Sequence, residues 1–78
     1  MNNFQSQSLA HILPGQFLKI RQLTNHPDVR SRLRELGFCE NAVVRCIAKG
    51  YGNIICEVCN ARFGIDSLTA SSIAVSNV

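Results

Sequence analysis

A short basic helix that must stop at a glycine is the feature that most constrains this fold. Val29, Leu33 and Leu36 are spaced i, i+4 and i+7, so they share one face of an α-helix. Gly37 follows them where helices commonly end in a left-handed turn, which glycine enters without a Cβ clash. Strand-like runs lie on both sides, so we expect a mainly β protein that contains this helix.

The sequence also indicates where the helix begins. Pro27 suits the first helical position, where its missing N–H costs nothing, and Asn25 or His26 precedes it. Asp28 would then lie in the first turn, where a carboxylate complements the helix dipole. The sequence therefore predicts one helix that begins at about Pro27 and ends at Gly37.

The helix carries a local positive charge. Arg30, Arg32 and Arg34 lie close together, in a chain whose formal net charge is only +3. Such a run is either a solvated helix face or an electrostatic docking site for an acidic partner or for phosphates. A net charge this small is not typical of a dedicated nucleic-acid-binding protein, so we expect no nucleic-acid partner.

The chain of 78 residues is long enough for one domain with a thin core. We expect a flexible tail over residues 1–8 and a single domain over residues 9–78. The polar N-terminus lacks the basic start and apolar run of a secretory signal, and no segment is apolar for the ~20 residues that cross a bilayer. We therefore expect a soluble cytoplasmic protein.

Alternating apolar residues predict five short strands, which suggests a small closed barrel that hides its strand edges. The predicted strands span residues 16–23, 43–48, 54–58, 62–66 and 73–75. Helical turns are expected over residues 8–13, capped by Ser8 or Ser6, and after Asp66 or Ser67. Tight turns are expected at residues 39–41 and 59–61.

The four cysteines have two interpretations. Cys56 and Cys59 have the spacing of metal or redox pairs, but residues three apart on a straight strand face opposite sides. A closed zinc site needs four ligands, while Cys46 looks buried and Cys39 lies in a distant turn. We interpret the cysteines as small structural residues. The alternative is a transition-metal-binding or metal-sensing protein that uses its thiols.

No catalytic motif is present, so we expect neither an enzyme nor a cofactor. The sequence lacks a nucleophile elbow, a phosphate-binding glycine loop and a zinc-protease motif, and its five acidic residues form no pair. His11 and His26 are isolated and are expected at the surface. An RNA-binding barrel is a weaker alternative, because Tyr51 is the only aromatic residue in an evident loop. By elimination, we expect a module that binds another molecule, whose identity these patterns do not reveal.

Taken as a whole, the chain resembles the FeoA family (ferrous iron transport protein A). The order and spacing of several segments carry the resemblance over about residues 8–76. These segments are Leu13-Pro14-Gly15-Gln16, Ile20-Arg21-Gln22-Leu23, Arg30 to Phe38, Val44, Ile54, Cys56, Val58, Phe63-Gly64-Ile65-Asp66 and Ala70 to Val75. The sequence departs from the family pattern at Asn41, where glycine is usual, and in residues 49–53, where proline is usual.

The resemblance implies an SH3-like β-barrel of about five strands with one short inserted helix. It also implies a cytoplasmic accessory protein that binds and modulates FeoB, the membrane importer of ferrous iron, which has a GTP-hydrolysing domain. Contact with the membrane would then be peripheral and through FeoB only. We expect Arg30, Leu33 and Arg34 to contact this partner, with core packing as the alternative role of Leu33.

Two questions stay open at this point. The same fold occurs as an appended domain of metal-dependent repressors, although a chain without a helix-turn-helix argues against that role. A homo-oligomer is possible, because small barrels often pair through exposed strands, but no pattern fixes the oligomeric state.

Overall fold

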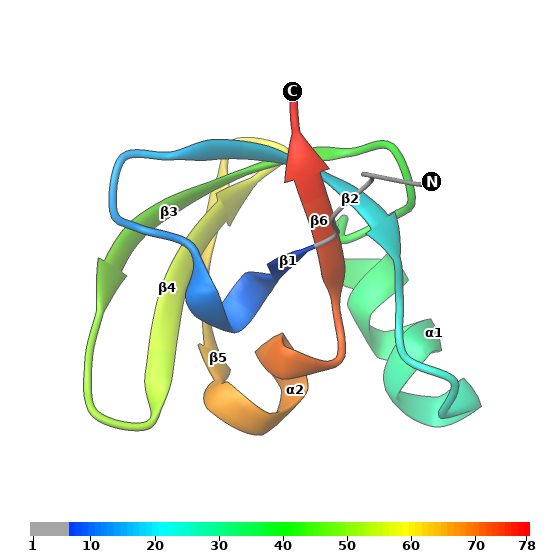
Figure 1. Ribbon diagram of the computed structural model, residues 1–78. Helices are drawn as coiled ribbons and strands as arrows, with labels where there is room; N and C mark the ends of the chain where they lie inside the picture. Colours follow the sequence, from blue (N-terminus) through cyan, green and yellow to red (C-terminus); the bar gives the residue numbers. More distant parts are fainter. Residues whose placement is uncertain (1–6) are drawn as a thin grey trace, which may run out of the picture.

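The computed structural model describes residues 7–78 and shows a strongly curved antiparallel sheet flanked by short helices (Figure 1). The elements in chain order are β1 (Gln7–Ser8), the 3₁₀ helix η1 (Leu9–His11), β2 (Phe17–Gln22), α1 (Pro27–Leu36), β3 (Val43–Lys49), β4 (Asn53–Val58), β5 (Ala61–Asp66), α2 (Ser67–Ser71) and β6 (Ala74–Asn77).

All six strands belong to one sheet, in the order β1-β6-β2-β3-β4-β5, and every neighbouring pair is antiparallel. The two edge strands, β1 and β5, do not pair with each other, so hydrogen bonds do not close the sheet into a complete barrel. Near this opening, α2 lies beside η1 and also against β5. The curved sheet and these short helices together enclose the core.

The predicted mainly β architecture with a helix between two strands is confirmed, with three corrections. The described residues form six strands, because Gln7–Ser8 is strand β1 and not tail. The sheet is open at its edges and not closed. The last strand begins at Ala74, one residue later than predicted, and reaches Asn77. The rest of the predicted tail, residues 1–6, lies outside the described residues.

The core is built by alternation on the strands. In β3 and β4, Val44, Cys46, Ile54, Cys56 and Val58 are all buried, which is the inward face that the period-2 pattern predicts. Other fully buried side chains lie in η1, β2 and β6 or directly beside them. These are Leu9, Ile12, Leu18, Ile20, Ile73 and Val75.

The β4–β5 hairpin closes through a two-residue turn. Cys59 and Asn60 both have positive φ, of 53° and 65°, as a type I′ turn requires. This turn type matches the right-handed twist of the two strands and fixes their register, with Val58 opposite Ala61. The predicted turn is therefore confirmed, except that Ala61 already belongs to β5.

Helix α1 ends as predicted, at Gly37 with φ 105°. The Phe38 N–H donates to the Leu33 carbonyl at 2.9 Å and the Gly37 N–H to the Arg34 carbonyl at 3.0 Å. These two bonds define a Schellman motif, which usually includes an apolar contact between its first and last residues. Leu33 and Phe38 are indeed members of the same buried core cluster. The helix end is thereby anchored in the core.

Gly37 is required for a second, tertiary reason. A Cβ added at this position would lie 3.0 Å from Cys59 Sγ and 3.7 Å from Val58 Cγ1. A side chain on Gly37 would therefore require the exposed Cys59 side chain to shift by a few tenths of an ångström. The end of α1 and the β4–β5 turn are therefore in close contact at this point.

We expect Gly37→Ala to destabilise the protein more than Gly15→Ala. Both glycines have positive φ, which costs an L-residue about 1–2 kcal/mol. A Cβ at Gly15 meets nothing within 4 Å, whereas one at Gly37 meets Cys59. The free energy of unfolding, measured by urea denaturation, should therefore fall further for Gly37→Ala.

A double variant isolates the contact. Replacing Cys59 with alanine in the Gly37→Ala background removes the sulfur at 3.0 Å and should recover part of the lost stability. Equal losses for Gly37→Ala and Gly15→Ala, with no recovery in the double variant, would contradict a close approach of α1 to the turn.

Candidate interaction surface

One side of α1 holds the helix to the sheet and the other sides are accessible. Leu33 is only 4% exposed, while Val29 and Leu36 are half-buried. This is the apolar stripe that the i, i+4, i+7 spacing predicts. At the start of the helix, Pro27 occupies the first turn as expected, and His26 is the N-cap but makes no side-chain capping bond.

The arginines of α1 differ in their surroundings. Arg32 and Arg34 are exposed and Arg30 is half-buried. Among residues 7–78 the ion pairs join Arg34 to Glu40 and join both Arg45 and Arg62 to Glu57. None of them involves Arg30 or Arg32. These two guanidinium groups therefore keep their charge available to a molecule outside the described chain.

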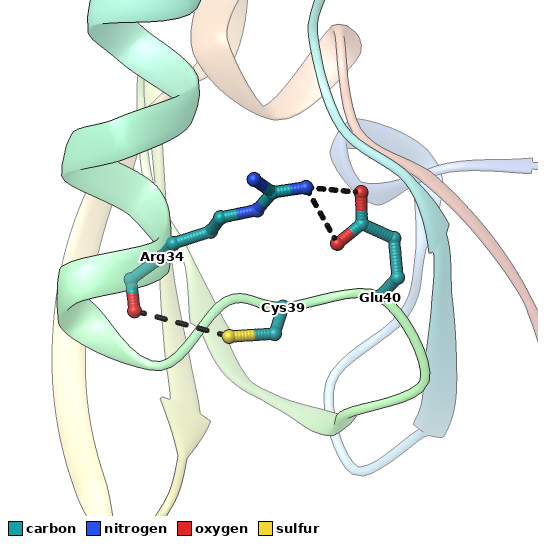
Figure 2. A network of polar contacts seen from close by, with 3 residues as sticks. All are labelled: Arg34, Cys39 and Glu40. Atoms are coloured by element: carbon teal, nitrogen blue, oxygen red, sulfur yellow. Dashed lines mark hydrogen bonds and ion pairs between the residues drawn. The ribbon is translucent and has the colours of Figure 1, made fainter.

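Figure 2 shows how Arg34 is held. Its side chain extends from α1 to the loop before β3, where the Arg34 Nη2 atom donates to both carboxylate oxygens of Glu40 at 3.0 and 3.2 Å. The Arg34 carbonyl also lies 3.8 Å from the Sγ of Cys39, whose thiol donates to it. Side chain and backbone of Arg34 therefore connect the last turn of α1 to the loop that follows.

The hydrogen bonds to the Glu40 carboxylate favour its ionised form. Its own backbone N–H and then the Arg34 side chain donate hydrogen bonds to the carboxylate, and they lower the pKa of Glu40 below its ordinary value. Glu40 thus stays ionised at neutral pH. It offsets part of the Arg34 charge, so Arg34 presents a weaker positive field than its position in the sequence suggests.

A groove of about 260 Å³ separates α1 from β5 and α2. Val29, Leu33 and Leu36 line it from the helix, and Gly64 and Ile65 line it from β5. Arg32 and Asp66 add one charge of each sign. The groove combines an apolar lining with Arg32, which makes no ion pair within residues 7–78, and this suits a peptide-like partner better than a small polar ligand.

The structure thus assigns different roles to the three predicted contact residues. Arg30 and Arg34 reach the surface of α1, with Arg34 paired to Glu40. Leu33 is 4% exposed and belongs to the buried core cluster, which is the alternative role given for it above. The role of Glu40 was missed, because it depends on how the loop after the helix turns back.

A second surface feature, also missed, crosses four strands. Strand pairing places one residue from each of β2, β3, β4 and β5 side by side, in the order Phe17, Arg45, Glu57 and Arg62. The Arg45 guanidinium lies 5.4 Å from the centre of the Phe17 ring, and Glu57 lies 3.7 Å from Arg45 and 3.8 Å from Arg62. Sequence alone cannot reveal this row, because it depends on the strand registers.

The cysteines lie in two different environments. Cys46 and Cys56 are opposite each other in the β3–β4 pair and fully buried. Burial raises the pKa of both thiols, that of Cys56 to about 12. Cys59 is exposed in the β4–β5 turn and Cys39 is half-buried after α1. Cys56 is therefore a protonated core residue, while Cys59 lies at the surface.

Two further features bear on the kind of site. Within residues 7–78, no three or more His, Cys, Asp or Glu side chains are grouped so that they could hold a metal ion. No helix in this part of the chain has the length and apolar character that crossing a bilayer would require. The surface of α1 and its groove remain the main candidate site.

Comparison with known proteins identifies the family. The family model described as "FeoA domain" matches residues 7–77, which is nearly the whole chain. No sequence among the curated proteins matches.

Several solved structures share the fold. An iron uptake regulatory protein (FeoA) superposes with a TM-score of 0.87 at 20% identity, covering 95% of this chain and 100% of its own. A zinc-bound FeoA from Stenotrophomonas maltophilia, described as a prokaryotic SH3 domain protein, gives 0.79 at 24% identity, covering 90% of this chain and 89% of its own.

A manganese-dependent transcriptional repressor gives a TM-score of 0.88 at 16% identity. This chain is covered completely but spans only 45% of the repressor. The SH3-like fold therefore occurs both in FeoA proteins and within a longer regulator. The family model distinguishes these two groups of proteins, because it matches residues 7–77 of this chain. The chain therefore belongs to the FeoA family, which is associated with ferrous iron transport.

Proposed function

We propose that this protein is a cytoplasmic accessory protein of ferrous iron uptake that binds the cytoplasmic part of FeoB and modulates its activity. Membership of the FeoA family supports the link to ferrous iron transport. The relative from Stenotrophomonas maltophilia has been put forward as a ferrous iron transport activating factor, which supports a role in controlling a transporter. The protein would act by binding and not by catalysis.

One observation carries the proposed contact surface. Arg30 and Arg32 project from a helix that is fixed at its C-terminal end, and no ion pair within residues 7–78 involves either of them. Fixed cations of this kind favour a partner with an acidic surface, because complementary potentials steer association and set orientation. Arg34 contributes less, since Glu40 already pairs with it.

The groove beside α1 extends the proposed contact surface. Its apolar side chains could receive an apolar residue of the partner, next to the free charge of Arg32. An apolar centre with a charged rim is the usual anatomy of a protein–protein interface. Leu33 takes part through its position in the core and not through an exposed side chain.

We expect Arg30→Glu to weaken binding to the soluble GTP-binding domain of FeoB by roughly three- to tenfold, because it replaces an attractive rim charge by a repulsive one. Lys49→Glu is the matched control. It makes the same change of charge at the exposed end of β3, far from α1 in the sequence, where no ion pair is lost. Isothermal titration calorimetry measures both affinities.

The salt dependence of the affinity provides a second readout. Binding of the wild type should weaken as ionic strength rises, and Arg30→Glu should reduce that dependence. If Arg30→Glu folds and binds with wild-type affinity, α1 is not the contact surface. If both variants weaken binding equally, general electrostatic attraction and not the α1 surface explains the association.

The alternative function, thiol-based metal binding, makes a different prediction. With Cys56 buried and its pKa raised to about 12, only Cys39 and Cys59 should react with a thiol reagent in the folded protein. Raising the pH from about 7 to about 10 should leave Cys56 unreactive, because its thiol stays protonated below its raised pKa. Mass spectrometry of labelled peptides identifies the cysteines that react.

Thiol labelling in the presence of added metal tests whether the cysteines bind it. Ferrous iron or zinc should leave the labelling rates of Cys39 and Cys59 unchanged if the cysteines are structural. Joint protection of Cys56 and Cys59 by metal would contradict the buried position of Cys56 and would favour the metal-binding function.

A further inference from the structure

The free edge of β5 is the longest unpaired strand edge in the described sheet. β5 has six residues and pairs only with β4, whereas β1 at the other edge has two residues. Long edges expose backbone N–H and C=O groups to other strands, and proteins usually protect them with proline, lysine or a very short strand. The sequence of β5, Ala-Arg-Phe-Gly-Ile-Asp, has no proline and no lysine, and its protection is limited to the charges of Arg62 and Asp66 and to α1 across the groove.

The hairpin turn determines which backbone groups reach this edge. A two-residue turn closes on a hydrogen-bonded pair, here Val58 and Ala61, and hydrogen-bonded pairs then alternate along the strands. The N–H and C=O groups of Phe63 and Ile65 therefore face β4. Those of Arg62 and Gly64 point away from β4, towards the free edge.

The sequence along the edge is self-complementary. Read from either end, residues 62–66 run charged, apolar, glycine, apolar, charged, and the two charges are opposite. If two copies of β5 lie antiparallel with Gly64 opposite Gly64, Arg62 of each copy lies opposite Asp66 of the other. We propose that a second copy of this chain pairs with the β5 edge in this register and extends the sheet across a two-fold axis.

Backbone geometry permits this register. Gly64 carries outward-pointing N–H and C=O groups, so the two copies can exchange a pair of hydrogen bonds at the axis. Arg62 and Asp66 share the side of the strand opposite to the buried Ile65. Their side chains would therefore meet across the new strand pair on the outer face of the sheet, where opposite charges are stabilising.

The edge is accessible in the structure. Arg62 and Gly64 are both exposed, and no hydrogen bond joins α1 to β5 within residues 7–78. The groove described above separates the helix from the strand. The pairing does not use Arg30 or Arg34. Gly64 and Asp66 also line the groove of the proposed FeoB contact, so a second copy and FeoB would compete for this part of β5.

The dimer is expected to be reversible. Arg62 already lies 3.8 Å from Glu57, and Asp66 caps α2 by accepting from the Thr69 N–H at 3.2 Å and from the Thr69 hydroxyl at 2.6 Å. Both charges must therefore be shared with existing partners. Association should depend on concentration between about 10 μM and about 1 mM, the range of weak complexes.

Gly64 provides a direct test, because in the proposed dimer Gly64 of one copy lies opposite Gly64 of the other copy. A Cβ at Gly64 meets only the end of Ile55, at 3.4 Å, and its φ is not positive, so substitutions are tolerated by the fold. Gly64→Lys and Gly64→Glu each place two like charges opposite each other. Sedimentation equilibrium should show each variant dissociating with a constant raised about tenfold or more. Gly64→Ala, which adds no charge, is the control.

Mixing the two charged variants tests the register itself. A mixture of Gly64→Lys and Gly64→Glu should associate again, to within about threefold of the wild type, because opposite charges now face each other. Amide NMR spectra of each variant check that it is folded. The proposal is overturned if the wild type stays monomeric to about 1 mM, or if it dimerises and the charged variants dimerise equally well. Failure of the mixture to recover would also overturn it.

Discussion

The close approach of Gly37 to the β4–β5 turn is the constraint on which the proposed interaction surface depends. The helix stops there because Gly37 takes up a left-handed conformation that lets two backbone bonds close the last turn. The same residue lets the end of α1 lie close to Cys59, where a Cβ would be only 3.0 Å from the sulfur. Gly37 therefore sets where α1 ends, the apolar stripe of Val29, Leu33 and Leu36 holds the helix to the sheet, and together they place the arginines.

The open sheet is the second feature with functional consequences. A closed barrel of this size would have no free edge, but here β1 and β5 remain unpaired with each other. The short β1 edge offers little to another strand, while the β5 edge has exposed backbone and opposite charges at residues 62 and 66. The arginines of α1 are therefore available to a heterologous partner and the β5 edge to a second copy, and the groove between α1 and β5 is common to both surfaces.

The sequence predicts local features of this fold well and tertiary ones poorly. The helix, its stop at Gly37 and the inward face of β3 depend on spacing within a few residues, and all three are found. β1 was missed because two residues are too short for any periodicity. The open edge and the approach of Cys59 to Gly37 depend on how distant segments meet, and the pairing of Arg34 with Glu40 depends on how the loop after α1 turns back. The burial of Leu33 followed from the same apolar spacing that revealed the helix, and that spacing favours the core over a contact surface.

The most direct test of the account is an amide NMR titration of the isotope-labelled protein with the soluble GTP-binding domain of FeoB. The account predicts chemical-shift changes concentrated on residues 28–38 and on the groove residues of β5. Changes confined to surfaces away from α1 would contradict the assignment of the contact surface. An unchanged spectrum in the presence of a large excess of the domain would contradict binding to this part of FeoB altogether.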